Sequence, residues 1–99
     1  MSRYRVSKSA ERDLGSIFVY WAERAGVPVA DRLIDAIVER FRMLGEYPAA
    51  GVACADLAVG IRCFPAGKHL IYYRRSRRGI EILHVFDGRR DQKKARAGS

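Results

Sequence analysis

Apolar residues recur at helical spacing near the start of the chain. From residue 10 to residue 25 they stand at i, i+4, i+7, i+8, i+11 and i+15, which is one face of an α-helix. Ser7 or Ser9 can cap this helix, because a hydroxyl accepts a hydrogen bond from an unpaired N–H of the first turn. Gly26 with Pro28 just beyond it is typical of a helix end.

A second apolar stripe predicts a helix over residues 29–46. Its charged residues stand largely on the other side, as expected of a helix with one buried face. The helix ends before Pro48, because a proline disfavours the α conformation in the residue that precedes it. Two adjacent amphipathic helices with a tight link predict a helical hairpin.

The hydrophobic period changes in the second half of the chain. Residues 48–60 are small and rich in turn-forming types, so we interpret them as a loop. β-branched and aromatic residues predict strands over 61–64, 68–75 and 80–86, and alternation predicts another over 3–6. The last three strands are separated by "PAG" and "SRRG", which are short enough to join antiparallel neighbours in a meander.

The predicted order is β-α-α-β-β-β, which indicates an α+β fold of two layers. The helical hairpin would pack on the apolar face of a small antiparallel sheet. The other face of the sheet would stay open or be covered by a partner. We expect a single domain over residues 1–91 and a basic, frayed C-terminal tail over residues 92–99.

The charge of the chain is concentrated at one end. The net charge is +8, and residues 1–60 are neutral, with eight basic and eight acidic side chains. Residues 61–99 carry eleven basic side chains against three acidic ones, so they hold the whole excess. Such a field attracts polyanions, which include nucleic acids, acidic proteins and anionic membranes.

Several classes of protein are disfavoured by composition. Two cysteines are too few to staple a small secreted domain, so we expect Cys54 and Cys63 to be reduced thiols. The N-terminal segment lacks a signal peptide's apolar core, and no apolar run reaches the ~20 residues that cross a bilayer. We therefore predict a cytoplasmic protein that does not bind membranes. Its few Cys and His lack paired spacing, so we expect no metal and no cofactor.

Three stretches of the chain carry a resemblance to a known family, namely "YRVSKSAERDLGSIFVYWAERAG", "AVGIRCFPAGKHLIYYR" and "GIEILHVFDGRRD". In this order and spacing they resemble the RelE/ParE toxins of bacterial toxin–antitoxin modules, over roughly residues 4–91. The ParE branch is the most similar. The ending "HVFDGRRD" departs from that branch, because His84 takes a place often held by Arg and Asp87 a place often held by His.

The resemblance implies a toxin of a type II toxin–antitoxin system. A ParE-like toxin would inhibit DNA gyrase by binding it, without catalysis of its own. A cognate ParD-like antitoxin would neutralise it through an acidic or amphipathic C-terminal segment, in a hetero-oligomer whose contact with DNA is made by the antitoxin. A RelE-like toxin would instead cut messenger RNA on the ribosome, and a non-toxic basic module that binds nucleic acid is a third alternative.

RNA cleavage needs a base, an acid and cations that stabilise the phosphate. The chain has the cations but no Tyr or His after residue 84, where RelE-like nucleases place an aromatic residue or a histidine. His69 shares a strand face with Ile71 and Tyr73, and His84 shares one with Ile82 and Phe86. Both histidines are more typical of packed residues than of catalytic ones, so we favour a binding protein over an endoribonuclease.

We interpret the cations of the last strands and the tail as a docking surface for the target and the antitoxin. Arg89 and Arg90 would project near Arg62 and Lys68, where guanidinium groups can pair with carboxylates. The "RRSRRG" stretch is most simply a solvated hairpin tip. The candidate binding residues are Arg62, Lys68, His69, Arg74, Arg89, Arg90 and Asp91.

Overall fold

The structure, a computed structural model, describes residues 3–54 and 58–87. Two long helices and a five-stranded sheet account for most of these residues. The elements in chain order are β1 (Tyr4–Val6), α1 (Lys8–Ala25), α2 (Val27–Glu46), the 3₁₀ turn η1 (Pro48–Ala50), β2 (Val52–Ala53), β3 (Ile61–Ala66), β4 (His69–Ser76) and β5 (Gly79–Asp87).

The predicted fold class is confirmed: two helices pack on one sheet in an α+β arrangement. The strand order is β1-β5-β4-β3-β2, and β3, β4 and β5 form the expected antiparallel meander. The sheet is nevertheless mixed, because β1 pairs with β5 in parallel. The alternation within β1 predicts a strand but carries no information about the direction of its neighbour.

The segment that we expected to be a loop contains both η1 and the short strand β2. Strand β2 pairs with the start of β3, so that Val52 stands opposite Cys63 and Ala53 opposite Arg62. Both residues of β2 are exposed, and the strand is only two residues long. A strand this short leaves no alternating pattern that sequence analysis could detect.

Helix α1 begins where Ser7 caps it. The Ser7 hydroxyl accepts a hydrogen bond from the Ala10 N–H and donates one to the Leu83 carbonyl, both at 3.0 Å. The cap therefore also fixes the helix against β5. Gly26 ends α1 with a φ of 94°, which favours glycine. Helix α2 then begins two residues before its predicted start, with Pro28 in its first turn.

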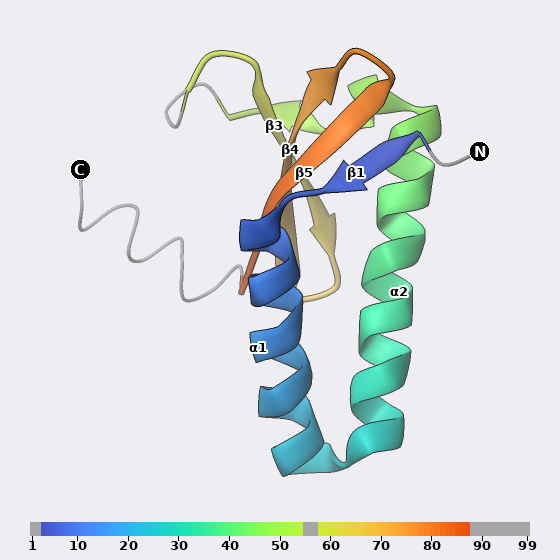
Figure 1. The fold of residues 1–99 in the computed structure, drawn as a ribbon, viewed down its shortest axis with the longest axis vertical. Helices are drawn as coiled ribbons and strands as arrows, with labels where there is room; N and C mark the ends of the chain where they lie inside the picture. Colours follow the sequence, from blue (N-terminus) through green and yellow to red (C-terminus); the bar gives the residue numbers. More distant parts are fainter. Residues whose placement is uncertain (1–2, 55–57, 88–99) are drawn as a thin grey trace.

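The core lies between the helical hairpin and one face of the sheet. The two helices lie side by side, and their linked ends extend past the sheet (Figure 1). Tyr73 is fully buried, whereas Tyr72 is half-buried on the other side of β4, as alternation requires. The side chains that are almost completely buried are Tyr73, Phe41, Ile37, Leu44, Ile71, Ile80, Ile82 and Val85.

Candidate interaction surfaces

The cations of the predicted docking surface do not form one cluster in the described part of the chain. Arg62 lies near the start of β3, and Lys68 lies in the turn after β3 ends. Between Arg62 and the end of β3 at Ala66 the strand runs for about 13 Å, and Lys68 lies beyond that end. Arg74 is exposed on the opposite face of the sheet from Arg62, because it neighbours Tyr73, which pairs with Arg62. The expectation that these cations converge is therefore wrong for the three that can be placed.

The remaining predicted cations, Arg89 and Arg90, lie outside the described residues, as does Asp91. Strand β5 ends at Asp87, which stands in register with His69 on β4. The described chain therefore ends beside the turn that carries Lys68, at the far end of the sheet from Arg62 and Arg74.

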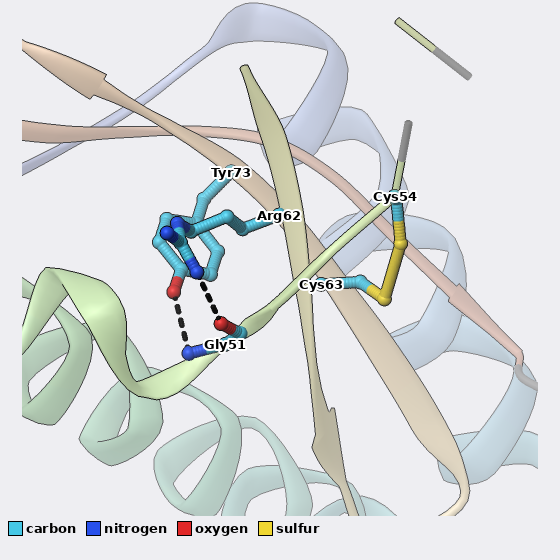
Figure 2. The surroundings of a disulfide bond; sticks show 5 residues. All are labelled: Gly51, Cys54, Arg62, Cys63 and Tyr73. Atoms are coloured by element: carbon cyan, nitrogen blue, oxygen red, sulfur yellow. Dashed lines mark hydrogen bonds between the residues drawn. A yellow bond between two sulfur atoms is a disulfide. The ribbon is translucent and has the colours of Figure 1, made fainter. Parts of the chain in front are cut away.

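Arg62 serves an internal role. Its Nη1 donates a hydrogen bond of 2.6 Å to the Gly51 carbonyl, and its side chain is half-buried (Figure 2). The Gly51 N–H donates to the Tyr73 hydroxyl at 2.8 Å, and that hydroxyl donates to the Pro48 carbonyl at 2.7 Å. We call these four residues the Gly51 corner. Together they satisfy the backbone groups that η1 and the approach to β2 leave unpaired.

Glycine is required at the centre of this corner. A Cβ on Gly51 would lie 2.7 Å from the Tyr73 ring and 2.9 Å from the Cys63 carbonyl oxygen. Both neighbours belong to the sheet, so neither can move away easily. The close approach allows the Tyr73 hydroxyl of β4 to bond to the backbone of Pro48 and Gly51, just before β2.

A disulfide between Cys54 and Cys63 lies next to the Gly51 corner (Figure 2). It joins the residue after β2 to β3, with the two Cα atoms 6.2 Å apart and nine residues apart in sequence. The structure therefore contradicts the expectation of two reduced thiols. That expectation rested on the number of cysteines, whereas the bridge depends on the pairing of β2 with β3.

His69 belongs to the interior. Only 4% of its surface is exposed, so its side chain is not available to a macromolecule docking on the outside. Burial lowers the pKa of His69, and the nearby Asp87 carboxylate opposes that shift. Its Nδ1 has no hydrogen-bond partner among residues 3–54 and 58–87. The surroundings of His69 therefore agree with a packed histidine and not with a residue that contacts a partner.

His84 has a partner that sequence analysis did not find. The Asp13 carboxylate of α1 accepts hydrogen bonds from His84 Nδ1 and from the Val85 N–H, both at 3.0 Å. Since β1 pairs with β5 only as far as Ile82, Asp13 covers the strand edge that β1 leaves open. Asp13 occupies an ordinary polar position of a helix, so no local pattern marks it. Among residues 3–54 and 58–87, no three His, Cys, Asp or Glu side chains gather to hold a metal ion.

Half-buried aromatic side chains line the outer face, which is the sheet face opposite the helical hairpin. A register shift between β4 and β5 places His84 on this face while Ile82 is buried in the core, so the expectation that these two residues share a face is wrong. The Tyr72 and Phe86 rings meet edge to face at 5.5 Å, and the His84 and Phe86 rings stack at 4.7 Å. Leu70 stands opposite Phe86 in the β4–β5 pairing and extends the same surface. We keep the name outer face for Leu70, Tyr72, His84 and Phe86.

A second cationic cluster lies where sequence analysis predicted only a solvated hairpin tip. Two adjoining hollows of about 370 and 310 Å³ lie between the start of β1 and the β4–β5 turn. We call this region the arginine tip, and its arginines are Arg3, Arg5, Arg75, Arg77 and Arg78. Sequence analysis missed the cluster because the first two arginines come from the other end of the chain.

The sequence of this chain is similar to those of known ParE toxins. The family model described as the ParE toxin of type II toxin–antitoxin system, parDE, matches residues 4–92. Toxin ParE1 of Caulobacter vibrioides is 33% identical over 85 residues, covering 86% of this chain and 88% of its own. Toxin ParE1 of Mycobacterium tuberculosis (strain H37Rv) is 30% identical over 91 residues, covering 91% and 93%.

A solved structure titled "Chromosomal ParDE TA system from P. aeruginosa" superimposes with a TM-score of 0.76. It is 20% identical in sequence, and the match covers 88% of this chain and 96% of that one. At that identity the likeness concerns the fold, which is the same two helices packed on one sheet. None of the helices in the described part of the chain is long and apolar enough to span a membrane.

Proposed function

The chain belongs to the ParE toxin family of type II toxin–antitoxin systems, and from this premise we propose that it arrests growth by binding DNA gyrase. A cognate antitoxin of the ParD kind neutralises it by covering part of its surface. The toxin acts by occupying its target, without a reaction of its own. Its site is therefore a surface, and the contacts of that surface decide which macromolecules it binds.

The observation that carries this proposal is the outer face of the sheet. Its aromatic side chains are held in place by one another, yet the helical hairpin packs on the opposite side. Aromatic side chains that are rigid and only half-buried are the typical anchors of a protein interface. An amphipathic segment of the antitoxin would bury its apolar side on Leu70, Tyr72 and Phe86.

The surroundings of the histidines support binding over catalysis. A general base must come within hydrogen-bond reach of the proton that it removes. His69 is buried in the core and cannot approach RNA that lies on the surface. His84 Nδ1 is engaged with Asp13, which also holds the backbone of β5. Burial therefore argues against His69 as a ribonuclease base, and the contacts of His84 with Asp13 and with the Phe86 ring show that this side chain is part of the sheet packing.

The target is tested by a gyrase assay with purified components. We expect the protein to block supercoiling of relaxed plasmid or to accumulate cleaved DNA, and we expect equimolar cognate antitoxin to restore activity. No effect on gyrase at saturating toxin would exclude the proposed target. Primer extension on translated messages is the companion measurement, because cuts at codon boundaries would assign the protein to the ribosome-dependent nucleases instead.

The surface is tested by substitution on the outer face. Phe86→Ser removes the ring that joins Tyr72 to His84, so we expect antitoxin affinity to fall at least tenfold in titration calorimetry. Val59→Ser is the matched control, because Val59 is 96% exposed and belongs to the segment between β2 and β3 rather than to the four residues of the outer face. Equal affinities for the wild type and Phe86→Ser, with thermal melting showing that the variant is folded, would place the antitoxin elsewhere.

Arg89 and Arg90, two of the predicted binding residues, are proposed as a second contact with the target and the antitoxin. Since the described chain ends beside Lys68, Arg89 and Arg90 are the cations of the tail that follow most closely. We expect the double substitution Arg89→Ala with Arg90→Ala to reduce toxicity on induced expression while thermal melting stays unchanged. Growth arrest as strong as that of the wild type would remove these residues from the docking surface.

A further inference from the structure

The arginine tip concentrates positive charge that the fold does not use. Four of its arginines line each of the two hollows, and the acidic residues beside them are Glu46 and Glu81. Glu81 is already paired with Arg74, whose Nη2 lies 2.9 Å from the Glu81 Oε1 on the sheet face opposite the helices. Within residues 3–54 and 58–87, none of the five tip arginines forms an ion pair.

Two glycines create this cluster by admitting the backbone of Arg3. The Arg3 carbonyl accepts a hydrogen bond of 2.9 Å from the Ile80 N–H, and a Cβ on Gly79 would collide with that carbonyl. Gly79 also has a φ of 146°, which side chains rarely adopt. On the other side, a Cβ on Gly45 would lie 3.1 Å from the Arg3 carbonyl carbon. The Arg3 backbone is thus fixed while its side chain stays exposed.

Fixing Arg3 brings the charges of distant segments together. Arg3 and Arg5 flank the first residue of β1, and the turn beside them holds Arg77 and Arg78 (Figure 1). Like charges this close repel one another, so the arrangement contributes nothing to folding by itself. An external polyanion relieves the repulsion and gains from all of the charges at once.

From this geometry we infer that the arginine tip binds the phosphate backbone of duplex DNA. The turn between β4 and β5 lies at the end of the sheet, and the start of β1 pairs with β5 beside it, so arginines from both segments can reach one nucleic-acid backbone. Duplex DNA carries one charge per about 1.7 Å of its axis, so several phosphates lie within reach of such a cluster. Guanidinium groups bind phosphate oxygens in a bidentate way, so Arg77 and Arg78 can contact phosphates while Arg3 and Arg5 contact others nearby.

An acidic protein segment fits this region less well. Protein partners need apolar anchors that become desolvated in the contact. The apolar side chains at the hollows are Tyr4, Pro48 and Ile80, and Ile80 is 99% buried while the other two are half-buried. The tip therefore offers five positive charges and little apolar surface, which suits a phosphate backbone better than an apolar protein segment. The inference goes beyond the proposed function and does not depend on gyrase being the target.

Fluorescence anisotropy with a labelled duplex of about 20 base pairs tests the inference in full-length protein made by cell-free translation. The variant is Arg77→Gln with Arg78→Gln. Each phosphate contact contributes about 0.9 to the slope of log affinity against log salt, so we expect the slope to fall by about 2. Affinity at low salt should fall at least tenfold, equally for unrelated sequences.

Two controls separate the tip from general positive charge. Arg32→Gln with Arg40→Gln removes the same charge from exposed positions of α2, and we expect the slope to change by less than 0.5. Lys93→Gln with Lys94→Gln removes it from the tail. Equal losses for all three double variants, or a loss in the tail variant alone, would overturn the assignment. So would an acidic peptide that binds through Arg77 and Arg78 while the duplex does not bind.

Discussion

Arg62 and Arg77 are the same residue type in the same basic half of the chain, but the fold uses them in opposite ways. The half-buried Arg62 side chain donates to the Gly51 carbonyl, and the exposed Arg77 has no ion pair among the described residues. The difference arises from the backbone nearby. The Gly51 corner presents a carbonyl that needs a donor, whereas the β4–β5 turn closes on itself and leaves its arginines to solvent.

Substitution of Gly79, whose backbone packs against Arg3 at the arginine tip, should have the largest effect on this comparison. Gly79→Ala forces a Cβ into the Arg3 carbonyl and imposes an unfavourable φ. We expect the free energy of unfolding to fall by about 3 kcal/mol or more. Urea denaturation followed by the fluorescence of Trp21 measures the loss. Because β1 would detach from β5, affinity for duplex DNA should also fall, although no arginine is changed.

Gly15→Ala is the control for this substitution. Gly15 lies inside α1, and nothing lies within 4 Å of an added Cβ. Alanine is the better helix former, so we expect a gain of about 0.5–1 kcal/mol. If Gly79→Ala unfolded at the same urea concentration as the wild type, Arg3 would not be held as described, and the structural basis of the arginine tip would be lost.

Substitution of the two arginines themselves tests the contrast directly. Arg62→Met leaves the Gly51 carbonyl without its charged donor, so we expect a loss of about 1–3 kcal/mol. Arg77→Met removes an exposed side chain and should change stability by no more than about 0.5 kcal/mol. For a domain of this size, each kcal/mol shifts the melting temperature by about 4–8 °C, which scanning calorimetry resolves.

DNA binding should show the reverse order. Arg77→Met is expected to weaken duplex binding and to lower the salt slope by about 1, whereas folded Arg62→Met should bind almost as the wild type does. If Arg62→Met melted like the wild type but lost DNA binding, Arg62 would belong to the docking surface after all. Its hydrogen bond to Gly51 would then be incidental.

The helices and the meander were predictable because their signals are local. The apolar stripe of α1, its cap at Ser7 and its end at Gly26 all lie within one segment, and spacing alone locates them. The same holds for β4, where alternation assigns one of two adjacent tyrosines to the core, and the structure shows that this residue is Tyr73. The function class was also predictable from the sequence, because the motifs that resemble the family occur in a fixed order along the chain.

The rest depends on contacts between distant segments. The disulfide needs β2, whose two exposed residues give no signal, and the arginine tip needs Arg3 to lie beside Gly79. His69 was named as a candidate binding residue even though its alternation with Ile71 and Tyr73 favoured a packed position. Its register opposite Ala66 places it on the core face instead. A count of charges cannot distinguish these positions, since burial is decided by which strand pairs with which.

His69 provides the smallest effect and the last test of the contrast between buried and exposed basic side chains. Because burial lowers the pKa of His69 in the folded protein, the unfolded chain takes up a proton near pH 6.5 while the folded chain stays neutral. The contribution of His69 to the free energy of unfolding should therefore be constant above pH 6.5. Below pH 6.5 it should decrease by at most about 1.4 kcal/mol per pH unit. Urea midpoints at pH 7.5, 6.5 and 5.5 measure the trend, and His69→Phe should lack this share of it. A variant that loses stability on acidification as steeply as the wild type would show that folding does not change the pKa of His69, and hence that the opposing effect of Asp87 offsets the effect of burial.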